Sequence, residues 1–119
     1  TTGVPFRPVA PNVATHNAAA QQADATSIRA FYQAMLGLRN RRPSIARGSF
    51  ENSFADGLVL GFERRLGSER SLVLINYGQQ ATTIRVPGQT VPGQAQVLYP
   101  AGATAFSLPA RSVQVIDLP

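Results

Sequence analysis

The spacing of apolar residues changes once along this chain of 119 residues, and the change restricts the folds available to it. Between residues 26 and 42, apolar side chains such as Ile28, Phe31 and Met35 recur every three or four positions, as on one face of an α-helix. From residue 48 onward the repeat becomes two, which is typical of β-strands. Strands are predicted at 49–54, 58–65, 71–77, 81–86, 95–99, 104–108 and 112–118. Short strands separated by Gly- and Pro-containing turns favour an antiparallel β-sandwich.

Two of these strands carry information about their position in the sheet. The sequence "SLVLINY" at 71–77 is almost continuously apolar, which predicts a central strand. The strand at 112–118 alternates, with Val113, Val115 and Asp117 on one face and Gln114, Ile116 and Leu118 on the other. The sequence "VPGQ" occurs twice, at 86–89 and 91–94, and two such turns indicate a loop rather than a repeat architecture.

Both ends of the predicted helix carry signals of their own. Asp24, Thr26 and Ser27 are candidate N-cap residues. The negative charge of Asp24 near the start also suits the helix dipole. The stretch "LRNRRP" places Arg39, Arg41 and Arg42 in the last turn, where cations are favourable, and Pro43 is expected to end the helix. Helix termination thus explains this cluster of arginines without any binding partner.

Charge and composition restrict the possible partners. The net charge is +5, but every basic residue is Arg, and most are scattered along the chain. A nucleic-acid site could use only the Arg39–Arg47 group, and it would lack the Lys residues that commonly contact phosphates. The absence of Cys excludes disulfides and thiolate metal sites, and no apolar run is long enough to span a membrane. We therefore expect neither nucleic acid nor a membrane as a partner.

The N-terminal segment, residues 1–24, is predicted to be irregular because Pro5, Pro8 and Pro11 forbid a helix and favour an extended path. The chain opens Thr1-Thr2-Gly3, without an initiator Met, which suggests a processed product or a fragment. A helix and a leader of this kind are expected to belong to a larger body.

No self-sufficient active site emerges from the residue types. His16 is the sole histidine and has only Asp24 nearby as a possible second metal ligand. The strand residues Glu51, Glu63 and Asp117 are expected on exposed faces or paired with Arg across strands, so no pair of carboxyl groups is predicted for glycoside hydrolysis. A "GxSxG" nucleophile turn and a phosphate-binding loop are both absent. The nine aromatic residues are expected mostly in the core, except Phe6 in the leader.

The order of these pieces resembles the end of an α-amylase family enzyme (glycoside hydrolase family thirteen). The segments that carry the resemblance are "TTGVPFRPVAPN", "HNAAAQQADATSIRAFYQAMLGLRNRRPSIARGSF", "DGLVLGFERRLGSERSLVLINYG" and "LPARSVQVIDL". These segments span nearly the whole chain. Their order and spacing are specific to the family, although no single segment is. Within the family, the leader is most similar to the branch of oligo-α-glucosidases, neopullulanase-like enzymes and trehalose synthases.

The resemblance implies an α+β fragment with a definite place for each part. Residues 1–47 would be the end of a (β/α)8 catalytic barrel, with loop 1–24 and last helix 26–42, and residues 48–119 would be the C-terminal antiparallel β-sandwich domain. Because loops after barrel strands form the active-site face, Phe6, Arg7 and Asn12 would border a sugar subsite. The catalytic carboxylates and any calcium ligands would lie upstream, so no catalytic residue, metal ligand or cofactor is assigned here.

The function implied is retaining hydrolysis of α-glucosidic bonds in starch-derived or related oligosaccharides. The partners implied are the upstream catalytic chain of the same enzyme and an α-glucan or α-glucoside substrate. A different hypothesis is a free-standing carbohydrate-binding or interaction sandwich without catalysis, which predicts an exposed aromatic platform. The helix carries an apolar stripe made of Ile28, Phe31, Met35 and Leu38. This stripe favours the first hypothesis because it requires a covering surface.

Overall fold

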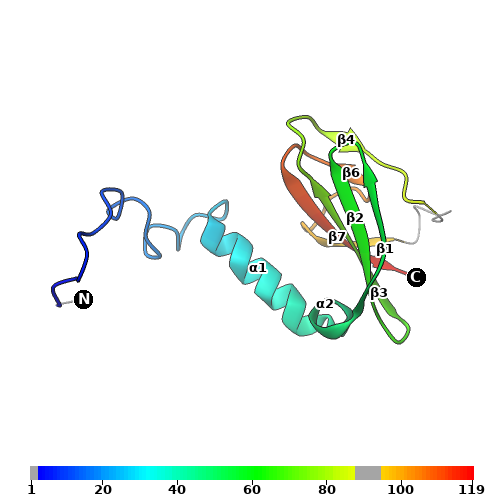
Figure 1. Ribbon diagram of the computed structural model, residues 1–119, viewed down its shortest axis with the longest axis horizontal. Helices are drawn as coiled ribbons and strands as arrows, with labels where there is room; N and C mark the ends of the chain where they lie inside the picture. The colour runs from blue at the N-terminus through cyan, green and yellow to red at the C-terminus, as the bar shows by residue number, and fades with distance from the viewer. Residues whose placement is uncertain (1–2, 88–94) are drawn as a thin grey trace. The chain divides into compact units, whose positions relative to one another are not determined.

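A computed structural model describes residues 3–87 and 95–119 of the chain (Figure 1). The second "VPGQ" sequence, at 91–94, and the last two residues of the first, at 88–89, lie outside the described residues. The chain divides into two compact units, Thr1–Gly37 and Leu38–Pro119, and each is described here by itself.

In the first unit, the leader contains turns but neither a helix nor a strand among its described residues, as predicted. Helix α1 (Ile28–Arg41) begins two residues later than expected. Ser27 is its N-cap, because the Ser27 hydroxyl accepts a hydrogen bond from the Ala30 N–H at 3.2 Å. Asp24 instead accepts hydrogen bonds from the Thr26 N–H and hydroxyl at 2.8 and 2.7 Å. No acidic residue lies in the first turn of α1. Asp24, the acid expected to favour the helix dipole, lies before the N-cap residue Ser27.

Pro43 has a different role from the predicted one. Helix α1 does end just before it, but Pro43 then begins a second helix, α2 (Pro43–Arg47), that the sequence reading missed. Arg42, with φ −118° and ψ 97°, is the extended residue between the two helices. A proline fits the first position of a helix because that position has no intrahelical acceptor for an N–H group.

The second unit contains an antiparallel five-stranded sheet in the order β1-β2-β3-β7-β5 (Figure 1). Its strands are β1 (Ser49–Asp56), β2 (Val59–Leu66), β3 (Glu69–Asn76), β7 (Ser112–Leu118) and β5 (Gln96–Tyr99). β3 lies at the centre, as its apolar sequence predicted. Short hairpin turns join β1 to β2 and β2 to β3, with Gly57 and Gly67 at φ +57° and +60°, a region that favours glycine.

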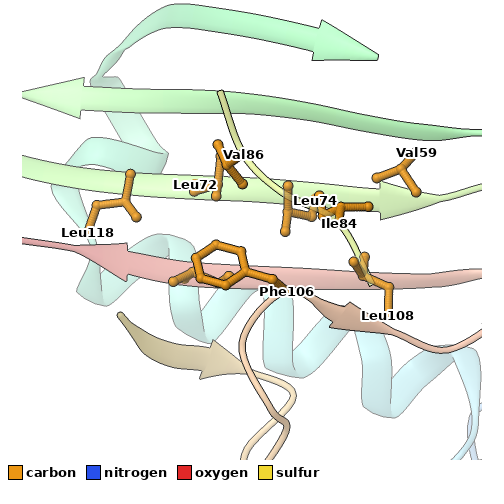
Figure 2. Close-up of a cluster of buried hydrophobic side chains, with 9 residues drawn as sticks. Val59, Leu72, Leu74, Ile84, Val86, Phe106, Leu108 and Leu118 are labelled. Carbon is orange, nitrogen blue, oxygen red and sulfur yellow. The ribbon is translucent and has the colours of Figure 1, made fainter. Parts of the chain in front are cut away.

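The second layer is small. Strands β4 (Thr82–Thr83) and β6 (Ser107–Leu108) pair as a two-stranded sheet, so the strands predicted at 81–86 and 104–108 are much shorter than expected. Residues Ile84, Phe106 and Leu108 of this layer pack against Leu72 and Leu74 of β3 (Figure 2). The core between the layers consists of Val59, Leu72, Leu74, Ile84, Val86, Phe106, Leu108, Ile116 and Leu118.

A buried amide fixes the loop that carries Phe106. The Gln114 side chain accepts a hydrogen bond from the Phe106 N–H and donates one to the Thr104 carbonyl, both at 2.9 Å. Phe106 has a φ of +65°, and these two bonds hold that unusual backbone in place. Gln114 therefore lies on the core face of β7 with Ile116 and Leu118, which confirms the predicted alternation.

Candidate functional site

The leader residues predicted to border a sugar subsite are all exposed. Phe6 has 99% of its surface accessible, and Arg7 and Asn12 are also exposed. The Asn12 carbonyl accepts hydrogen bonds from the Thr15 and His16 N–H groups at 3.0 and 2.8 Å, so Asn12 begins a turn. Within residues 3–87 and 95–119, no hydrogen bond or ion pair joins these three side chains. Their role in substrate binding remains a prediction.

His16 contacts its neighbour rather than a metal-binding group. Its Nδ1 atom lies 2.8 Å from the Thr15 hydroxyl. In the described part of the chain, no group of three or more His, Asp or Glu side chains is placed to hold a metal ion. The helices described are also too short or too polar to cross a membrane.

Arg42 joins the helical segment to the sheet. Its Nη2 lies 2.5 Å from Asp117 Oδ1, and its Nη1 lies 3.3 Å from Asp117 Oδ2, which makes a two-point contact with a residue 75 positions away. Nη2 also donates to the Ser71 hydroxyl and the Arg70 carbonyl, both at 3.2 Å. The Arg42 side chain is only 17% exposed. Arg42 is thus a structural residue, and the prediction that it serves the last turn of the first helix was wrong.

Glu69 completes this cluster of polar groups. Its Oε1 accepts a hydrogen bond from the Ser44 N–H at 2.6 Å and lies 3.8 Å from Arg42 Nε. The Ser44 and Ser71 hydroxyls are 2.8 Å apart and fully buried. The Ser44 hydroxyl lowers the pKa of Glu69, the Ser44 N–H and the Arg42 charge act in the same direction, and desolvation opposes them. The cluster fixes the N-terminus of α2 against β3 and β7.

A second ion pair lies on the core-facing side of the sheet. Arg70 Nη2 is 3.0 Å from Glu63 Oε2 and 3.2 Å from Oε1, and the Glu63 side chain is 5% exposed. The predicted pairing of Glu63 with an arginine is confirmed, but the alternative of an exposed face is wrong for this residue. Because Glu63, Glu69 and Asp117 are each engaged with arginine, they serve as structural partners. The described residues offer no pair of free carboxyl groups flanking a cleft, which hydrolysis of a glycoside would need.

The aromatic residues depart furthest from expectation. Phe106 is the buried one among them, whereas the aromatics with more than a third of their surface exposed are Phe6, Phe31, Tyr32, Phe50 and Tyr77. Phe50 stacks on Phe62 with ring centroids 4.8 Å apart and planes at 28°. The prediction that these side chains lie mostly in the core was therefore wrong, and β1 and β2 carry an aromatic pair in which Phe50 is exposed and Phe62 is half-buried.

Sequence reasoning missed the Arg42 cluster for a definite reason. The contact between Arg42 and Asp117 spans most of the chain, and neither residue stands out among the eleven arginines and six acids. One local signal was present in the sequence "RPS" at 42–44, where a proline followed by Ser44 could have indicated a new helix start.

Comparison with known proteins gives the chain its context. No family model matches it. It is 29% identical over 86 residues to a probable α-glucosidase of Rhizobium meliloti (strain 1021), and 27% identical over 92 residues to an oligo-1,6-glucosidase of Parageobacillus thermoglucosidasius. These matches cover 72% and 76% of this chain but only 16% of each relative. The chain therefore spans about a sixth of the length of the curated relatives that it matches.

Two solved structures share the fold of this chain over all or nearly all of its length. An isomaltulose synthase from Klebsiella sp. LX3 has a TM-score of 0.76 at 25% identity, covering 100% of this chain and 22% of that enzyme. The Bacillus licheniformis trehalose-6-phosphate hydrolase has a TM-score of 0.73 at 24% identity, covering 98% of this chain and 23% of that one, which shows a shared fold. The sandwich predicted from the strand pattern is the one these enzymes carry in their C-terminal regions. The chain resembles the C-terminal region of enzymes of the α-amylase family, glycoside hydrolase family thirteen.

Proposed function

We propose that this chain is the C-terminal portion of a retaining glycoside hydrolase that cleaves α-glucosidic bonds in starch-derived or related oligosaccharides. The observation that carries the proposal is the match itself, since over 70% of the chain aligns with two glucosidases of which it covers only 16%. The carboxylates that would attack the sugar and protonate the leaving group lie upstream in this proposal. A retaining mechanism needs two such groups about 5–5.5 Å apart.

In this proposal the chain has two parts with different roles. Residues 1–47 form the end of the catalytic barrel, and residues 48–119 form the C-terminal sandwich that supports it. The exposed Phe6 ring and the Arg7 and Asn12 side chains contact the substrate from the last barrel loop. An exposed aromatic ring can stack on a sugar, and a guanidinium and an amide supply hydrogen-bond groups for its hydroxyls.

The reaction is tested on the complete enzyme with maltose, isomaltose and an aryl α-glucoside. Proton NMR of the first product is expected to show the α-anomer, because two inversions give net retention. Initial release of the β-anomer, or no cleavage of any of the three, would refute the proposal. The 119-residue chain alone is expected to be inactive.

The subsite is tested by Phe6→Ala, with Val4→Ala as the matched control, because both side chains are almost fully exposed in the same leader. Loss of one stacking contact is expected to lower kcat/KM about tenfold, the equivalent of about 1.4 kcal/mol. The control should change kcat/KM less than about twofold. Equal effects of the two substitutions would remove Phe6 from the proposed subsite.

A further inference from the structure

Two loops lie side by side at one end of the sandwich. The loop from β1 to β2 and the loop from β3 to β4 meet there, because Val59, the first residue of β2, pairs with Asn76, the last residue of β3. Between the two loops lies a cavity of about 290 Å³, which is named the loop cavity. The residues that line it include Asp56, Leu58, Gln79, Gln80 and Thr82.

A buried asparagine fixes the backbone of the second loop. Asn76 is 2% exposed, its Nδ2 donates to the Gln80 carbonyl at 2.9 Å, and its Oδ1 accepts a hydrogen bond from the Gly78 N–H at 2.8 Å. The two loops are also joined directly, since the Tyr77 N–H donates to the Leu58 carbonyl at 2.9 Å. The backbone around the loop cavity is therefore held by contacts of the fold itself.

The polar side chains at the loop cavity take no part in these contacts. Across residues 3–87 and 95–119, no hydrogen bond or ion pair engages the side chains of Asp56, Gln79, Gln80 and Thr82. An aspartate at a hairpin turn commonly accepts a hydrogen bond from the backbone of its own turn, and among the described groups Asp56 does not. Leu58 is 67% exposed, although it is apolar. A fixed backbone that carries unused polar groups and an exposed apolar group is preorganised for a ligand.

The chemistry of these residues favours a neutral ligand with several hydroxyl groups. None of the described residues that line the loop cavity is basic and Asp56 is the sole acid among them, so an anion would be repelled. A hard cation is usually held by several carboxylates, and the loop cavity offers one. Amide side chains both donate and accept hydrogen bonds, as sugar hydroxyls require. A volume of about 290 Å³ is at the small end for ligand pockets and suits one sugar unit.

We propose that the loop cavity binds one glucose unit of an α-glucan or α-glucoside, where the choice of glucose rests on the proposed function. The Asp56 carboxylate accepts hydrogen bonds from two adjacent hydroxyls, and Leu58 packs against the C–H face of the sugar ring. The Gln79 and Gln80 amides bind the remaining hydroxyls. None of these residues belongs to the leader, so the loop cavity is an addition to the subsite proposed there.

The sugar site is located by photolabelling the complete enzyme with a maltotriose that carries a diazirine at its reducing end. Mass spectrometry of the peptides is expected to find label within residues 56–59 or 76–82. An excess of maltotriose should remove this label, whereas trigalacturonic acid, which is similar in size but negatively charged, should not. Label found only outside these two ranges, or equal displacement by the two competitors, would overturn the inference.

A matched pair of glutamine substitutions tests the contact itself. Gln79→Ala removes an amide at the loop cavity, and Gln96→Ala removes one from an exposed position of β5. Because one hydrogen-bonding side chain is lost, Gln79→Ala should lower the yield of label in residues 76–82 about tenfold. Gln96→Ala should change that yield less than about twofold. Equal losses of label in the two variants would contradict the proposed role of Gln79.

Hydrolytic activity of the same unsubstituted preparation reports separately on the proposed function. Hydrolysis of an aryl α-glucoside without label at the loop cavity overturns only the sugar site. Label at the loop cavity without hydrolysis of any α-glucoside overturns only the proposed function.

Discussion

The contact between Arg42 and Asp117 should be a main source of cohesion between the helical segment and the sheet. Replacing Asp117 by Asn keeps the shape of the side chain but removes its charge. Arg42 would then lose a two-point, charge-assisted contact at 2.5 and 3.3 Å while remaining 17% exposed. Hydrogen bonds to charged groups contribute about 1.5–3 kcal/mol. Because Asp117 is 34% exposed and water can replace part of the contact, we expect about 2 kcal/mol of destabilisation.

A double-mutant cycle separates this contact from other effects of the substitutions. Arg42→Met removes the guanidinium and retains most of the stem, so it should cost about 2–3 kcal/mol, including the bonds to Ser71 and the Arg70 carbonyl. The double mutant should be less destabilised than the sum, with a coupling energy of about 1–2 kcal/mol between the two sites. Asp56→Asn, at an exposed hairpin turn, is the matched control and should cost less than about 0.5 kcal/mol.

The assay is urea unfolding of the 119-residue chain followed by circular dichroism, because an ionic denaturant would screen the ion pair. Thermal scans should show a fall in Tm of about 8 °C for Asp117→Asn. A coupling energy below about 0.5 kcal/mol would refute the reasoning, because the contact would then be no stronger than an ordinary surface pair.

Three further substitutions test other contacts. Gly48→Ala should cost about 2–3 kcal/mol in urea unfolding, because the new Cβ would lie 2.4 Å from the Ser44 carbonyl oxygen and force α2 away from the sheet; wild-type stability would contradict this. Gln114→Leu should cost about 2–3 kcal/mol, because the Phe106 N–H would lose its buried acceptor, and an unchanged urea midpoint would rule that out. The pKa of Glu69 is lowered in the folded state, so its contribution is present above about pH 4.3 and is lost as the pH falls through the lowered value. Glu69→Gln should accordingly flatten the acid limb of urea midpoints measured from about pH 6 to 3, and an unaltered limb would exclude Glu69 as a source of that dependence.

Local patterns predicted the parts of the fold that depend on neighbouring residues. The continuous apolar run of β3 placed it at the centre of the sheet, and the alternation of β7 placed Gln114, Ile116 and Leu118 on one face, which the structure shows to be the core face. Both follow from the two-residue repeat, which requires no knowledge of distant partners. The boundaries of α1 were correct within two residues for a similar reason, since Ser27 and Pro43 act over a single turn.

Features that depend on tertiary contacts were not predicted. Helix α2 has five residues, too few to show a helical repeat, and its position depends on Glu69 and Ser71. The strands predicted around β4 and β6 shortened because only two residues of each find a pairing partner. The burial of Glu63 required the position of Arg70, which a list of charges does not give. The candidate subsite residues Phe6, Arg7 and Asn12 came from family resemblance and remain predictions.

The contacts of Arg42 and Ser44 show how a helix of five residues is fixed on a sheet. The Ser44 hydroxyl lies 2.8 Å from that of Ser71, the Ser44 N–H donates to Glu69, and the adjoining Arg42 binds Asp117. Glu69 and Ser71 lie on β3 and Asp117 lies on the neighbouring β7, so groups from two strands determine the position of α2. Because hydrogen bonds are directional, these contacts fix the orientation of α2 as well as its place, which a helix too short to bury an apolar face could not achieve by packing alone.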